Sequence, residues 1–192
     1  MEWSAANRWT EDVNYPTNFL YAQTLEAASR ILGEKALLTR AEAVRRETIC
    51  QSFDGFRFYD HAIRNETGEL ELQKDCSEIA QYYAILFGGI DLESAAYARL
   101  KELVLCRCVP DSGDYPKDME PINAFIGVYL RMEALLKIRA YGHVLREAKA
   151  FFGEMEAVTG TLWEYRQRKG SRDHGFASYA LVGILRALNQ QE

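Results

Sequence analysis

The chain of 192 residues has few of the side chains that bind metals or form disulfide frameworks, with three histidines and four cysteines. No two cysteines have the two-residue spacer of a zinc knuckle or a thioredoxin motif. We therefore predict no metal site and no cofactor. Because free cysteines are commonly buried, we expect all four to be reduced core residues: Cys50, Cys76, Cys106 and Cys108.

The sequence also lacks an excess of positive charge and a long apolar run. Its formal net charge is −5 and its pI is about 5.4, so we expect no nucleic-acid partner and no attraction to anionic lipid. No apolar run approaches the roughly 20 residues of a membrane span, so we expect no membrane partner. Met1-Glu2-Trp3 opens without the basic and apolar regions of a secretory signal, which favours a cytoplasmic location.

The composition is that of an ordinary globular protein, with 48% hydrophobic and 27% charged residues. Aromatic residues make up 12%, enough to fill a core and to leave rings for a binding surface. No Pro/Gly/Ser-rich linker and no block of like charges interrupts the chain. The sequence therefore predicts a single domain over residues 1–192.

Apolar residues at three- and four-residue spacing predict a series of helices separated by short breaks. The first helix begins at Pro16, a residue suited to the first helical position, and ends at Gly33. A second helix covers about residues 34–50. The Phe-rich segment 53–60 and the turn residues 65–68 predict a short β-hairpin or an ordered loop.

The later helices are of two kinds. A capping-box pattern at Asp75-Cys76-Ser77-Glu78 predicts one helix start. The helix from Pro121 has apolar stripes on two sides and the last helix, about 176–188, is apolar almost all round, whereas 141–158 has one stripe. Hairpins that pair a doubly buried helix with an amphipathic one indicate an all-α fold of about seven helices, arranged as in an α/α toroid. An α-solenoid has a similar pattern.

The loop between the last two helices, residues 160–175, is the richest in chemistry. It holds Trp163, Glu164 and His174 within a short stretch. Inverting glycoside hydrolysis needs a carboxylate base beside a water, with a carboxylic acid about 6.5–9.5 Å away. Glu164 suits that base, Trp163 offers a flat face to a sugar, and His174 can donate to a hydroxyl. The alternative is that all three residues are structural. Trp163 then packs in the core, Glu164 is solvated, and His174 is a structural hydrogen-bond partner at a helix start.

The order of these residues resembles a known family. Thr161-Leu162-Trp163-Glu164, followed by Ser171 and His174-Gly175-Phe176-Ala177-Ser178, is similar to the C-terminal signature of bacterial α-L-rhamnosidases, the six-hairpin glycoside hydrolases of family seventy-eight. The resemblance extends over about residues 14–188 through the helix motifs at 16–21, 77–82 and 125–130. It implies the C-terminal half of an α/α toroid, with Glu164 as general base. It also implies that Trp163, His174 and Tyr129 bind the substrate, a terminal rhamnose or related sugar.

A complete toroid of this type needs about 350 residues or more, so this chain corresponds to part of one. The family's general acid comes from the half that is missing here. We therefore expect either the missing half or a second copy of the chain as a partner, covering an inner face that includes Tyr82, Phe125 and Tyr129.

Two functions remain open at this point. One is glycoside hydrolysis, and the other is a non-catalytic carbohydrate-binding or assembly module built on half a toroid. A helical-repeat scaffold is a third reading, but the sequence has no internal period of about 40 residues.

Overall fold

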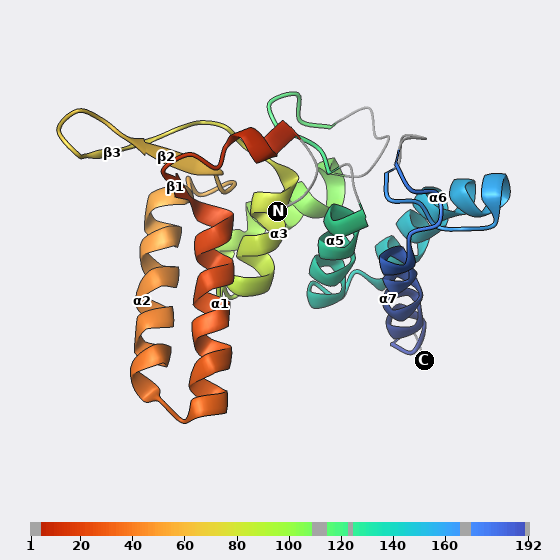
Figure 1. The fold of residues 1–192 in the computed structure, drawn as a ribbon, viewed down its shortest axis with the longest axis horizontal. Helices are drawn as coiled ribbons and strands as arrows, with labels where there is room; N and C mark the ends of the chain where they lie inside the picture. Colours follow the sequence, from red (N-terminus) through yellow and green to blue (C-terminus); the bar gives the residue numbers. More distant parts are fainter. Residues whose placement is uncertain (1–4, 109–114, 123–124, 166–169, 191–192) are drawn as a thin grey trace.

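A computed structural model describes residues 5–108, 115–122, 125–165 and 170–190. In these residues the chain is mostly helical, which confirms the predicted helical class (Figure 1). Short 3-10 turns lie at Ala5–Arg8, Ala95–Tyr97 and Gly175–Ser178, and a π-helical turn lies at Leu103–Arg107. The α-helices are α1 (Tyr15–Leu32), α2 (Lys35–Ser52), α3 (Glu78–Phe87), α4 (Ala98–Glu102), α5 (Phe125–Lys137), α6 (Tyr141–Thr159) and α7 (Tyr179–Leu188).

The bounds of α1 follow from local chemistry. The Asn14 side chain accepts a hydrogen bond from the Thr17 backbone N–H at 3.0 Å and so caps the helix. Pro16 lies in the first turn, where its missing N–H has no helical partner to lose. Gly33 ends the helix with φ of 74°, and its N–H donates to the Ser29 carbonyl. The predicted start and end of this helix are confirmed.

A small antiparallel sheet lies at the N-terminal end of α1 (Figure 1). Its strands are β1 (Val13–Asn14), β2 (His61–Arg64) and β3 (Leu70–Leu72), in the order β1-β2-β3. The Asn65 side chain accepts from the backbone N–H groups of Thr67 and Glu69, which fixes the turn between β2 and β3. The turn at residues 65–68 was predicted, but the strands of the hairpin follow the Phe-rich segment 53–60 instead of including it. Strand β1 was not predicted, because two residues are too few to show the alternation of apolar and polar side chains that indicates a strand.

Four of the helices form a row. α1 packs against α3, α3 against α5, and α5 against α7, while α2 packs on α1 and α6 packs on both α5 and α7. All four helices of the row run in the same direction, with their N-terminal ends toward the top of Figure 1. In Figure 1 α2 stands beside α1, on the side away from α3. The loops at the N-terminal ends gather along one edge.

The main core lies along the row and between the row and α6. Eight consecutive residues of α3, from Glu78 to Ile85, are all buried, and in α5 both predicted stripes supply buried residues such as Val128, Met132 and Leu135. In α6 only one stripe is buried, as predicted: Ala148, Phe151, Phe152 and Met155. The two-sided and one-sided apolar patterns of the sequence therefore correspond to row helices and to α6.

Two expectations about the elements are wrong. Cys50 and Cys106 are exposed, so only Cys76 and Cys108 are core residues. The capping-box pattern predicts Asp75 as the cap of α3, but the observed cap is Ser77, whose side chain accepts from the Ala80 N–H. None of the helices in the part of the chain that the structure describes is long and apolar enough to cross a membrane.

Candidate functional site

The loop between α6 and α7 returns on itself and is held by backbone hydrogen bonds. Gly160 ends α6 in a left-handed conformation, with φ of 71°. The Glu164 N–H donates to the Ser171 carbonyl at 2.9 Å, and the His174 N–H donates to the Leu162 carbonyl at 2.9 Å. These bonds align the two arms of the loop. They place Glu164 on one arm of the loop and His174 on the other.

Glu164 is half-buried, and its position depends on a glycine. Its carboxylate oxygen Oε2 accepts from the Ser171 N–H at 3.2 Å. Gly170 has φ of 72°, and a Cβ built there would lie 2.9 Å from that oxygen and 2.7 Å from the Tyr165 ring. Only glycine fits both the left-handed backbone and the close approach. The loop therefore holds the carboxylate directly over the Gly170 backbone.

Trp163 does not lie where the sequence placed it. Its side chain is among the largest that are fully buried, with 1% of the residue exposed. The indole Nε1–H donates to Thr159 Oγ1 at 2.7 Å, and the backbone N–H points at Met155 Sδ, so α6 holds the residue in the core. The Arg172 guanidinium lies 5.8 Å from the ring centroid. The expected open sugar-binding face of Trp163 is corrected to a core position.

His174 is half-buried and directly precedes the 3-10 turn that leads into α7. Its side chain makes no capping hydrogen bond to that turn. Backbone pairing instead sets His174 opposite Leu162, two positions before Glu164. The structure thus brings Glu164 and His174 onto the two arms of one loop.

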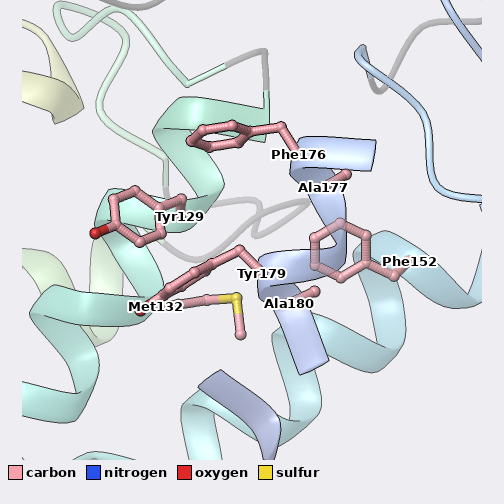
Figure 2. A pocket seen from close by; sticks show the side chains of 7 residues that line it. All are labelled: Tyr129, Met132, Phe152, Phe176, Ala177, Tyr179 and Ala180. Carbon is pink, nitrogen blue, oxygen red and sulfur yellow. The ribbon is translucent and has the colours of Figure 1, made fainter. Parts of the chain in front are cut away.

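Tyr129 lines an aromatic pocket between α5, α6 and the start of α7 (Figure 2). Its ring meets that of Tyr179 edge to face at 4.1 Å. The free volume is about 10 Å³, the room of a single water molecule, so the pocket as it stands does not admit a sugar. Phe176 is 59% exposed at its rim. The pocket is lined by Tyr129, Met132, Phe152, Phe176, Ala177, Tyr179 and Ala180.

A carboxylate lies close to this pocket. Glu133 accepts hydrogen bonds from the Tyr179 hydroxyl and from the Arg186 guanidinium. Burial and the Glu133 carboxylate both raise the pKa of Tyr179, so its hydroxyl stays protonated as a donor. The Glu133 contacts tie α5 to α7 at the level of the aromatic pocket.

A buried charge network is the feature that the sequence reasoning missed. Arg131 is 2% exposed, and it donates to the Tyr82 hydroxyl at 2.7 Å and to both carboxylate oxygens of Glu147. Tyr82 in turn donates to Glu78 at 2.7 Å, and the Ile122 N–H donates to the same carboxylate. Burial raises the pKa of Glu78, while Arg131 opposes that shift. The network joins the row helices α3 and α5 to the covering helix α6.

This network also corrects the expected inner face. Tyr82 is fully buried, so it does not lie on an uncovered surface. The side chain of Phe125 falls outside the described residues, and Tyr129 is half-buried. A charged residue within a buried apolar stripe, such as Arg131 between Leu130 and Met132, is the sequence signal that would have indicated a paired interior charge.

A second buried carboxylate anchors the start of α3. Asp60 is 2% exposed and accepts from the N–H and the hydroxyl of Ser77, at 2.6 and 2.7 Å. Burial, opposed by these bonds, raises the pKa of Asp60 to about 7. The neighbouring Asp75 pairs with His61 Nε2 at 2.9 Å and lies two residues before Ser77, the observed cap of α3.

No group of three or more His, Cys, Asp or Glu side chains suited to a metal ion occurs among the described residues. No family model matches the chain, and no curated protein or solved structure matches it either.

Proposed function

We propose that this chain is the base-bearing half of an inverting glycoside hydrolase of the α-L-rhamnosidase type. The observation that carries the proposal is the Glu164 carboxylate, held over Gly170 in a loop whose residues resemble the signature of that family. The loop lies at the N-terminal end of α7 (Figure 1). The row of α1, α3, α5 and α7, with α6 packed on α5 and α7, supports an arc of an α/α toroid.

In this proposal Glu164 accepts the proton of a water molecule as that water attacks the anomeric carbon from the face opposite the leaving group. The carboxylic acid that protonates the leaving oxygen comes from the part of the toroid that precedes this chain. His174, on the facing arm of the loop, donates to a sugar hydroxyl. Tyr129 and the rim of the aromatic pocket face the bound ring.

The burial of Trp163 changes which ring serves as the sugar platform. Among the aromatic side chains of this region, Phe176 has 59% of its surface exposed, whereas Trp163 has 1%. A sugar stacks on an accessible aromatic face, so Phe176 takes the platform role in the proposal. Phe176→Ala then weakens rhamnose binding with little loss of stability. Trp163→Ala instead destabilises the fold by about 3–5 kcal/mol. NMR titration with L-rhamnose measures the loss of binding, and denaturant melts measure the loss of stability.

An activated substrate tests the base without the missing acid. The dinitrophenolate of a dinitrophenyl α-L-rhamnoside leaves without protonation, so hydrolysis depends on the activation of water. The chain is expected to hydrolyse it, and Glu164→Gln lowers the rate by about 10² to 10⁴. Glu156→Gln, on the exposed side of α6, is the matched control and leaves the rate unchanged. Equal rates for the wild type and Glu164→Gln would remove the assignment.

A non-catalytic carbohydrate-binding or assembly module is the second candidate. Its assembly form is favoured by the exposed apolar residues of α7, which include Leu181 and Leu185. The same substrate distinguishes the two functions. A module without turnover binds L-rhamnose with equal affinity in the wild type and in Glu164→Gln, and neither protein releases dinitrophenol.

A further inference from the structure

Three sulfur-bearing side chains lie together in a small core that is separate from the main one. Cys76, Cys108 and Met119, named here the sulfur cluster, are each at most 4% exposed. Tyr59 and Leu103 pack in the same core. The Cys108 thiol donates to Met119 Sδ across 3.6 Å. The fold therefore brings together two thiols and a thioether that are far apart in the sequence.

A backbone bridge turns Cys76 and Met119 to the same side. The extended segments around Ser77 and Glu120 pair in parallel, and the Glu120 N–H donates to the Cys76 carbonyl at 2.8 Å. Successive side chains of an extended segment alternate in direction, so the residues that precede Ser77 and Glu120 share a face. Those residues are Cys76 and Met119. Because Met119 also contacts Cys108, its thioether joins the two thiols into one group.

The surroundings of Cys76 suit a thiolate as well as a thiol. Its S–H donates to the Phe58 carbonyl at 3.3 Å. Gln81 Nε2 donates to the Cys76 sulfur at 3.4 Å and to the same Phe58 carbonyl at 2.8 Å, so that carbonyl keeps a donor when the thiol loses its proton. Burial raises the pKa of the Cys76 thiol and the Asp60 carboxylate adds to the rise, whereas the Arg57 guanidinium opposes it. Arg57 Nε is buried and has no hydrogen-bond partner among the residues that the structure describes, so it can donate toward an anionic site.

We propose that the sulfur cluster binds one Cu(I) ion through the thiolates of Cys76 and Cys108 and the thioether of Met119. Thiolate and thioether ligands are soft and select Cu(I), whereas structural Zn²⁺ sites take four ligands. Binding breaks both S–H bonds, forms three Cu–S bonds and releases two protons to solvent, with no change in oxidation state. Arg57, which also pairs with Asp118, offsets part of the single negative charge on the bound site. The spacing of histidines and cysteines does not reveal this site, because its third ligand is a methionine.

Transfer of Cu(I) from a coloured chelator tests the site. The chain is titrated without oxygen into the Cu(I) complex of bicinchoninate, and the wild type is expected to remove one ion per chain. Cys76→Ser and Cys108→Ser abolish the transfer. Met119→Leu keeps the side-chain volume and weakens the affinity by at least about 10-fold, the lower end of what the loss of an outer-shell partner costs. X-ray absorption at the copper edge gives three sulfur neighbours in the wild type and two in Met119→Leu.

The exposed cysteines supply matched controls. Cys50→Ser and Cys106→Ser leave the transfer unchanged, because neither thiol lies in the sulfur cluster. Circular dichroism verifies that each variant remains helical. A wild type that leaves the copper on bicinchoninate, or that exchanges its copper for an equal amount of Zn²⁺, overturns the proposal. Loss of binding in Cys106→Ser with full binding in Met119→Leu also overturns it, because Cys106 and Cys108 then hold the metal without the thioether.

Discussion

Removal of the Arg131 guanidinium is the sharpest test of the buried network. Arg131 is 2% exposed and donates to Tyr82, to Glu147 and to the Val104 carbonyl. Its replacement by methionine keeps most of the side-chain length but leaves Glu78 and Glu147 without their cation. Breaking a buried ion pair by removing one partner costs about 3–5 kcal/mol. Since domains are stable by about 5–15 kcal/mol, Arg131→Met removes about a fifth or more of that margin.

Urea denaturation followed by circular dichroism measures this effect, because the transition midpoint falls while the slope stays the same. Arg146→Met is the matched control, since Arg146 is exposed on α6, and it changes stability by less than about 0.5 kcal/mol. Adding Glu78→Gln and Glu147→Gln to Arg131→Met restores part of the loss, because the uncompensated charges are gone.

The pH dependence of Arg131→Met gives a second check. Burial raises the pKa of Glu78 in the folded protein, and without Arg131 the hydrogen bonds from Tyr82 and the Ile122 N–H oppose that shift without a neighbouring positive charge. A group with a raised folded-state pKa stabilises the fold at low pH and loses that contribution as pH rises. The destabilisation by Arg131→Met therefore shrinks as pH falls from neutrality toward the ordinary pKa of a glutamate. A loss below about 1 kcal/mol at pH 7, or one that does not change with pH, would refute the buried network.

Two further predictions follow from the loop and from α3. Gly170→Ala forces a Cβ against the Glu164 carboxylate and lowers dinitrophenyl rhamnoside hydrolysis, while Gly160→Ala has the same left-handed backbone but open space and leaves it unchanged. Kinetics on both variants, with melts to verify folding, measure this difference. Asp60 has an ordinary pKa of 3.8 that burial raises to about 7, so its contribution to stability is present below pH about 4 and lost toward pH 7. Asp60→Asn removes this pH dependence of the unfolding free energy, which amounts to about 1.4 kcal/mol per unit of pKa shift. Denaturation series at several pH values measure it.

The helices were predictable where local chemistry sets them. Pro16 and Gly33 bound α1 through backbone geometry alone, and the single buried stripe of α6 follows from three- and four-residue spacing. Neither depends on distant parts of the chain. The hairpin of β2 and β3 was predictable for the same reason, since the Asn65 side chain builds its own turn.

Side-chain burial was less predictable because it depends on partners far along the chain. Trp163 is buried since Met155 and Thr159 of α6 lie against it, a contact that the loop sequence does not reveal. Tyr82 is buried against Arg131, which donates a hydrogen bond to its hydroxyl and lies 49 residues further along the chain. The position of Glu164 over Gly170 depends on a left-handed backbone that glycine permits but does not dictate.

The configuration of the first-formed sugar tests the central claim most directly. Proton NMR of dinitrophenyl α-L-rhamnoside incubated with the chain follows the anomers before they equilibrate in solution. If Glu164 activates water as a general base, the β-anomer of L-rhamnose appears first, and Glu164→Gln abolishes that signal. Initial release of the α-anomer, or no release above the rate in buffer, would contradict the account.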